Sequence, residues 1–214
     1  MEPPIESLLS GERLEIAKMQ DAIVKMVYDY VQPDAIMHGG TAIWRCYDGG
    51  RFSEDIDIYV NNTFEKRLYP ELRKRNIEIV WKDGDLPLHM KLSDGSAEIL
   101  LEASIGRYEN SSAQYIRTDG SSITVTTLSP TELLVRKIEA YEGRRYIRDI
   151  YDIMHLTNYL HRDDAYVISK MKPFLKNIKK PVDEKILHSL IYKGNKKLTF
   201  DEMAAYLKGW IYEV

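Results

Sequence analysis

The chain has 214 residues, of which 44% are hydrophobic and 29% charged, and its formal net charge is −3. This balance argues against a disordered chain and against an overall strongly basic nucleic-acid-binding protein, and the single cysteine, Cys46, excludes an internal disulfide. No apolar run approaches the roughly 20 residues of a membrane helix, and the acidic start lacks a signal-peptide pattern. We therefore expect a cytoplasmic protein with no membrane partner.

The first part of the chain mixes helical and strand-like patterns. Apolar residues recur at near-helical spacing over residues 5–30, and residues 64–75 are also helix-like. Short apolar or alternating runs predict strands at 35–37, 55–60, 77–81, 89–92, 97–104 and 123–127, the last of which would close the sheet. Residues 93–96 predict a hairpin turn, and Thr41 is expected to cap a helix that continues through Tyr47.

The patterns become helical after Leu128-Ser129-Pro130. Helices are predicted at about 131–143, 146–160, 163–176, 183–192 and 199–210, with breaks at glycine and proline residues. We therefore predict an α/β part over residues 1–128 and a helical part over residues 129–214.

Two aspartates occupy alternate positions of the predicted strand at 55–60. Asp55 and Asp57 point to the same face with Cα atoms roughly 6.6 Å apart, because successive strand side chains alternate between faces. Two carboxylates this close repel each other unless a cation lies between them, and their oxygens suit Mg²⁺ or Mn²⁺. The alternative is an exposed pair of acidic residues with no ligand, although Ile56 and Ile58 indicate a strand that packs into a core.

A pair of glycines precedes this strand by about fifteen residues. Gly39 and Gly40 let the backbone approach a ligand closely, and the helix that follows offers its N-terminus to phosphate. Phosphate binding beside a divalent metal is typical of phosphoryl or nucleotidyl transfer.

Glu102 interrupts the otherwise apolar stretch of the strand predicted at 97–104. A charged side chain in such a place is usually paired or coordinates a metal. Glu102 is therefore the candidate for a third carboxylate, and a solvent-exposed glutamate on an edge strand is the alternative.

Several segments, in order, resemble one known family. Residues 37–43 (MHGGTAI), 51–58 (RFSEDIDI), 101–104 (LEAS), 130–140 (PTELLVRKIEA) and 148–153 (RDIYDI) are similar to the motifs of AbiEii-type (MenT-like) toxins. These toxins form a branch of the DNA polymerase β-like nucleotidyltransferases. The sequence departs from the pattern at Leu100, where relatives often have lysine, and at Glu102, where many have aspartate.

The resemblance implies an α+β fold, namely a minimal nucleotidyltransferase fold with a mixed sheet flanked by helices and a helical C-terminal half that completes the active site. It implies NTP as substrate, Mg²⁺ or Mn²⁺ as cofactor, an antitoxin as partner, and the 3′ end of tRNA as acceptor. Asp55, Asp57 and Glu102 would hold the metal, with Glu102 supporting it or acting as base. Lys137 would bind the triphosphate as a catalytic residue.

Each of the remaining nucleotide-binding candidates either contacts the nucleotide or has a structural role. Thr41 lies in the glycine segment, Ser53 either binds a phosphate or caps a turn, and Arg51 pairs either with a phosphate or with a local carboxylate. Asp149 is a site candidate by resemblance, whereas ion pairs with Arg145 and Arg148 are the structural alternative for Asp149 and Asp152.

Lys137 also belongs to a predicted cationic face. Together with Tyr141, Arg144 and Arg148 it would share one helical face, provided that the helix continues past Gly143. We assign a functional role to Lys137 and a structural one to Arg144.

The identity of the acceptor stays open in the sequence. Residues 165–197 contain nine lysines and only two acidic residues, Asp183 and Glu184. This excess of positive charge indicates either a solvated helical surface or a patch that holds RNA phosphates. A protein side chain or a small molecule as acceptor, and an inactive binding module, are the alternatives.

Overall fold

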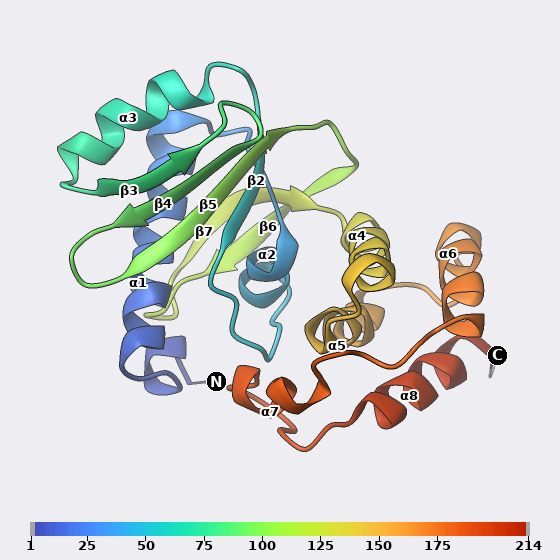
Figure 1. Cartoon of the computed structure of the whole chain (residues 1–214). Helices are drawn as coiled ribbons and strands as arrows, with labels where there is room; N and C mark the ends of the chain where they lie inside the picture. The colour runs from blue at the N-terminus through green and yellow to red at the C-terminus, as the bar shows by residue number, and fades with distance from the viewer. Residues whose placement is uncertain (1–2, 213–214) are drawn as a thin grey trace. The chain divides into compact units, whose positions relative to one another are not determined.

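The computed structural model describes residues 3–212 (Figure 1). The chain divides into two compact units. The first consists of the residues up to Asp48 together with Ser53–Leu128, and the second consists of Gly49–Phe52 together with the chain from Ser129 onward. No helix of the described residues is long and apolar enough to cross a membrane.

The first unit is built on one mixed sheet of seven strands in the order β3-β4-β5-β2-β1-β7-β6. The strands are β1 (Ile36–His38), β2 (Ile56–Val60), β3 (Glu78–Asp83), β4 (Leu88–Ser93), β5 (Glu98–Ile105), β6 (Asn110–Ile116) and β7 (Ser122–Leu128). The pairs β2–β5 and β1–β7 are parallel, and the other neighbours are antiparallel. The predicted α+β class with a mixed sheet is confirmed.

Alternation along the central strands explains how the sheet packs. In β2 the side chains of Ile56, Ile58 and Val60 are buried, whereas Asp57 and Tyr59 point to the other face and are partly exposed. Helix α1 (Glu12–Met26) contacts β5 and lies behind the strands in Figure 1. One face of the sheet therefore lies in the core of the unit, and the opposite face carries the polar residues.

Four further helical segments complete the described part of the first unit. A 3-10 turn at Ile5–Ser7 precedes α1, and a π-helical segment at Val27–Val31 extends α1 and contacts α3 (Phe64–Lys74). Helix α2 (Gly39–Cys46) follows β1 without a linker and packs against β2 and β6.

The second unit is helical apart from the short segment Gly49–Phe52. It contains α4 (Pro130–Arg144), α5 (Ile147–Leu156) with a 3-10 turn at Thr157–Tyr159, α6 (Ala165–Lys176), a 3-10 turn at Glu184–Ile186, α7 (Leu187–Leu190) and α8 (Phe200–Tyr212). Pro130 is the first residue of α4, and the Ser129 hydroxyl accepts a hydrogen bond from the Glu132 amide at 3.2 Å, so the start of α4 is capped by its sequence. Helix α4 packs against α5 and α6, and α8 packs against α5 and α6.

The structure corrects the predicted elements at several places in the first unit. The helix predicted over residues 5–30 is interrupted at Gly11, which has a φ of +57°, and consists of three segments. The sequence prediction missed β6, which lies at the edge of the sheet, so β7 does not close it. Only Tyr115 of β6 is buried, and an edge strand with so little apolar content has no strong alternation.

In the second unit, Lys137, Tyr141 and Arg144 lie on one helix, but the predicted cationic face does not extend to Arg148. Helix α4 ends at Arg144, and Arg145 adopts a left-handed conformation with a φ of 54°. Arg148 therefore belongs to α5 and not to the helix of Lys137. The single helix predicted over residues 183–192 is a 3-10 turn followed by the short α7.

Candidate active site

The carboxylate of Asp57 lies against the first residue of α2. Gly39 has a φ of +73°, and a Cβ atom placed on it would lie 1.8 Å from Oδ2 of Asp57 and 2.7 Å from its Cγ. Only glycine fits this position, both because of the backbone conformation and because of the space that Asp57 occupies. The glycine thus brings a strand carboxylate to a helix N-terminus, where unpaired backbone N–H groups gather.

A polar row crosses four neighbouring strands at this level. The strand register pairs His38 with Asp57, Asp57 with Glu102, and Glu102 with His89. Paired residues of adjacent strands point to the same face, and all four side chains are partly exposed. His89 Nδ1 lies 3.7 Å from Glu102 Oε1, and the ring of His38 stacks on Tyr59 with centroids 4.0 Å apart. Two carboxylates therefore stand side by side, with an imidazole beyond each of them.

Asp55 lies immediately before β2 and not within it, so the predicted strand was one residue too long. Its carbonyl oxygen accepts a hydrogen bond of 2.5 Å from the Thr41 hydroxyl. The carbonyls of Ser53 and Glu54 both accept hydrogen bonds of 2.9 Å from Nε2 of Gln20 in α1. Two helices thus fix the loop that leads into the carboxylate strand.

Thr41 does not cap the N-terminus of α2, so the sequence prediction for this residue was wrong. Helix α2 begins two residues earlier, at Gly39, and no side chain caps its N-terminus. The Thr41 side chain is instead buried and holds the Asp55 loop.

Within residues 3–212, no group of three or more His, Cys, Asp or Glu side chains is arranged so that it could hold a metal ion. The strand register nevertheless places Asp57 beside Glu102, and the backbone of Asp55 is anchored two residues before Asp57. These three residues are the ones that the sequence analysis assigned to the metal, and that assignment stays a prediction.

A buried ion-pair network occupies the second unit. Asp152 accepts two hydrogen bonds from Arg51, at 2.5 Å (Nε) and 2.6 Å (an Nη atom), and Nζ of Lys137 lies 2.7 Å from the same carboxylate. Asp149 accepts two hydrogen bonds of 2.9 Å from Arg144 and lies 3.5 Å from Nζ of Lys137. Three cations thus surround two carboxylates, and only Arg144 is substantially exposed, with 40% of its side-chain surface accessible.

Charge compensation holds this network together. Burial alone would raise the pKa of Asp152, but the neighbouring Arg51 and Lys137 hold its pKa below the ordinary value. Burial likewise opposes the charge on Arg51, whereas the Asp152 carboxylate raises its pKa. Both side chains are therefore ionised in spite of their burial.

The network shows which ion pairs the candidate residues form. The carboxylate interpretation of Arg51 is the one that the structure contains. Asp149 and Asp152 do form ion pairs, but with Arg144, Lys137 and Arg51, and not with the two arginines that were expected. Asp152, which the sequence analysis considered only as an ion-pair partner, contacts two cations that are far apart in sequence, Arg51 and Lys137.

The chain is similar to known proteins in sequence and in fold. A model of the family described as "Nucleotidyl transferase AbiEii toxin, Type IV TA system" matches residues 28–213. No curated protein sequence matches. Among solved structures, JHP933 from Helicobacter pylori is similar with a TM-score of 0.62 and 21% identity, covering 95% of this chain and 91% of that one. The nucleotidyltransferase toxin MenT4 from Mycobacterium tuberculosis is similar with a TM-score of 0.63 and 13% identity, covering 94% and 83%. At these identities the two structures show that the fold is shared.

Proposed function

Because the chain belongs to the AbiEii nucleotidyl transferase toxin family, and is therefore a nucleotidyltransferase, we propose that it transfers NMP from an NTP to the 3′ end of a tRNA in the cytoplasm. The reaction uses Mg²⁺ or Mn²⁺, and a cognate antitoxin counteracts it. The acceptor hydroxyl oxygen attacks the α-phosphorus, pyrophosphate leaves, and the hydroxyl loses its proton.

The observation that carries this proposal is the position of Asp57. Its carboxylate lies against Gly39 at the start of α2, and its strand register places it beside Glu102. A helix N-terminus attracts phosphate, and neighbouring carboxylate oxygens suit a hard divalent cation. When bound there, the metal would neutralise charge on the triphosphate.

The residues around Asp57 have the following roles in the proposal. Asp55 and Asp57 hold the metal, and Glu102 supports it or accepts the hydroxyl proton. Gly39 and Gly40 let the backbone of α2 approach the phosphates. Thr41 fixes the Asp55 loop through its 2.5 Å hydrogen bond. Ser53 lies in the same loop and binds a phosphate in this proposal.

Lys137 and Asp149 are the residues that the family resemblance assigns to the nucleotide, and Arg51 is a further nucleotide-binding candidate. Lys137 can take this role if its ammonium group exchanges the Asp152 carboxylate, now 2.7 Å away, for a phosphate oxygen. Such an exchange leaves Asp152 compensated by Arg51, with which it forms two hydrogen bonds.

Nucleotide transfer is tested with the purified chain, each labelled NTP in turn, and total tRNA, with Mg²⁺ or with a chelator. We expect labelled tRNA only with metal, and a loss of at least about 10²-fold in Asp57→Asn, because one carboxylate of the pair is removed. Asp34→Asn, an exposed residue of the same unit, serves as the control for the chemical change. Activity of Asp57→Asn close to that of the control would overturn the assignment of Asp57 to the active site. Label found on a protein or a small molecule in place of tRNA would overturn the assignment of tRNA as the acceptor.

The RNA acceptor is tested separately through salt. Phosphate contacts release counterions, so log affinity should fall by roughly 0.7–0.9 per contact with log salt. Lys176, Lys196 and Lys197 are exposed, and reversing them to glutamate should flatten this slope while NTP binding stays unchanged. Unchanged tRNA modification in the triple variant would mean that these lysines are only a solvated surface.

A further inference from the structure

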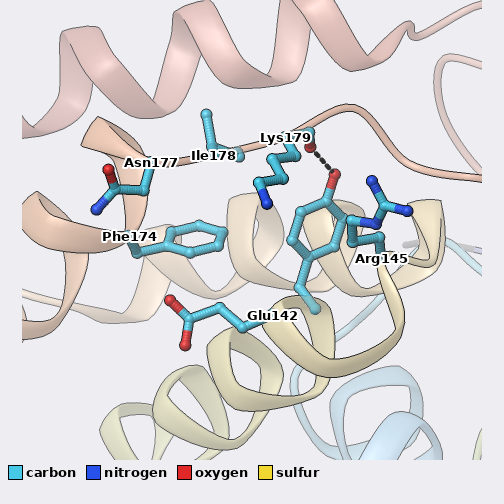
Figure 2. A pocket seen from close by; sticks show the side chains of 7 residues that line it. Glu142, Arg145, Phe174, Asn177, Ile178 and Lys179 are labelled. Atoms are coloured by element: carbon cyan, nitrogen blue, oxygen red, sulfur yellow. Dashed lines mark hydrogen bonds between the residues drawn. The ribbon is translucent and has the colours of Figure 1, made fainter.

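The second unit contains a cavity of about 300 Å³ at the ends of two helices (Figure 2). Tyr141, Glu142 and Arg145 line it from the end of α4, and Phe174 lines it from the end of α6. The segment after α6 closes it with Asn177, Ile178 and Lys179. The volume lies at the small end of the range found for ligand pockets, and the function proposed above uses none of these residues for catalysis.

Hydrogen bonds hold the frame of the cavity in place. The hydroxyl of Tyr141 donates to the Lys179 carbonyl at 2.6 Å, and the amide of Val182 donates to the Arg145 carbonyl at 3.0 Å. The rings of Tyr141 and Phe174 meet edge to face, with centroids 5.9 Å apart. The segment 177–182 is thus fastened to the end of α4, so the cavity does not have to form when a ligand binds.

One end of the cavity offers hydrogen-bond acceptors. In Figure 2 the carboxylate of Glu142 and the carboxamide of Asn177 both lie near Phe174. The Asn177 amide nitrogen already donates to the Pro173 carbonyl at 3.1 Å, which leaves its carbonyl oxygen as an acceptor. Within residues 3–212, Glu142 has no ion-pair partner. A ligand at this end must therefore present N–H donors beside a flat apolar group.

The rest of the cavity offers cations. In Figure 2 the guanidinium of Arg145 lies away from Phe174 and Asn177, and the ammonium of Lys179 lies between Phe174 and Arg145. Neither forms an ion pair with a carboxylate of the described chain. The C-terminal ends of α4 and α6 disfavour anions, so these two side chains must supply the attraction for an anionic group. Arginine in particular forms two parallel hydrogen bonds with phosphate.

From these contacts we propose that the cavity binds one nucleoside monophosphate unit whose base carries an amino group. The base lies by Phe174 and donates to Glu142 and Asn177, and the phosphate lies by Lys179 and Arg145. Guanine fits best, because its adjacent ring N–H and amino group can donate to both oxygens of one carboxylate. Uracil fits worst, because it presents one N–H between two carbonyls. The inference rests on the proposed function in one respect, because the acceptor RNA of that function is the expected source of the nucleoside monophosphate.

Binding is measured by calorimetry with GMP, AMP, CMP and UMP as probes and the full-length Asp57→Asn chain, so that no turnover is needed. We expect GMP to bind at least about tenfold more tightly than UMP, the difference produced by one charge-assisted hydrogen-bond pair. Glu142→Gln should remove this preference, and Lys179→Gln should weaken all four nucleotides about tenfold. Glu139→Gln on α4 and Lys172→Gln on α6, two exposed residues outside the lining, are the matched controls and should change neither the GMP preference nor the affinity.

The outcomes separate the possibilities. No binding of any nucleotide, or equal binding of all four in the parent and in Glu142→Gln, would overturn the proposal. Competition between GMP and a short 5′-phosphorylated RNA identifies RNA as the source, and its failure identifies a free nucleotide. Glu142, Lys179 and the two control residues are exposed, so we expect their exchanges to leave the fold intact. Because binding is read in the Asp57→Asn chain, a negative result here leaves the transfer reaction at Asp57 untouched.

Discussion

Replacing Gly39 with alanine tests how closely the first turn of α2 and the carboxylate strand depend on each other. The added Cβ would lie 1.8 Å from Oδ2 of Asp57, whereas real Cβ atoms essentially never come within 3.0 Å of such a neighbour. The carboxylate, or the start of the helix, therefore has to move by about 1.2 Å, the difference between these two distances. In addition, the φ of +73° is strained for any residue with a Cβ.

Two effects of different size follow from this geometry. The left-handed backbone costs about 1–2 kcal/mol of stability, as it does for an L-residue elsewhere. The displaced carboxylate should lower turnover by about 10²-fold, because a misplacement of about 1 Å in an active site has consequences of this order. Activity should therefore fall much further than stability.

The assay compares NMP transfer and thermal unfolding of Gly39→Ala with those of Gly95→Ala. Gly95 has a φ of +86°, but a Cβ on it would meet nothing within 4 Å. This control variant therefore has the same backbone strain without the clash. Equal activities in the two variants would refute the reasoning, because they would show that the contact between Gly39 and Asp57 does not position the carboxylate.

Three further predictions concern buried groups. Lys137→Ala should raise the KM for NTP at least about tenfold, because a cation is lost from the triphosphate, and should destabilise the fold by about 1–3 kcal/mol, because Arg51 still compensates Asp152. Arg144→Ala leaves the buried Asp149 only the 3.5 Å contact with Lys137, so it should cost about 1–3 kcal/mol with a smaller effect on KM. An unchanged KM in Lys137→Ala would contradict the triphosphate role. The folded-state pKa of Asp152 lies below its usual 3.8, so the stability that its charge provides is present above pH 3.8 and is lost as the pH falls through the lower folded-state value. The free energy of unfolding measured with denaturant should therefore fall in acid, and this pH-dependent part of it should be missing in Asp152→Asn. Burial raises the pKa of the Cys46 thiol to about 12, so iodoacetamide should label it at pH 8 only as the chain unfolds, and fast labelling of the native protein would contradict this.

Local patterns allowed much of the sheet and of the carboxylate strand to be predicted. The alternation of Ile56, Asp57 and Ile58 has the period of a strand and therefore indicates both the element and the face of the aspartate. The hairpin between β4 and β5 was predictable because its turn residues are local. Strand β6 was not, because Ser111, Ser112 and other polar residues give an edge strand no apolar face.

Relations between distant segments could not be predicted from the sequence. His38 and His89 join the polar row only through strand pairing, and no spacing in the sequence indicates which residues are paired. Arg51 and Asp152 are 101 positions apart, so the sequence left two interpretations of Arg51 open. The residue types were identified as candidates, but their partners depend on the register of the sheet and on the packing of α4 against α5.

The segment Gly49–Phe52 has a consequence for dividing the chain into fragments. It packs with the helical unit although it lies between two parts of the sheet unit in sequence. Its contacts include hydrogen bonds of 2.9 Å from the Phe52 amide to the Leu190 carbonyl and 3.1 Å from the Tyr192 amide to the Gly50 carbonyl. A fragment that starts at Ser129 would lack the guanidinium that compensates Asp152. Expression of the helical half alone should therefore yield a poorly folded product, and supplying residues 49–52 through an N-terminal linker should restore its cooperative unfolding.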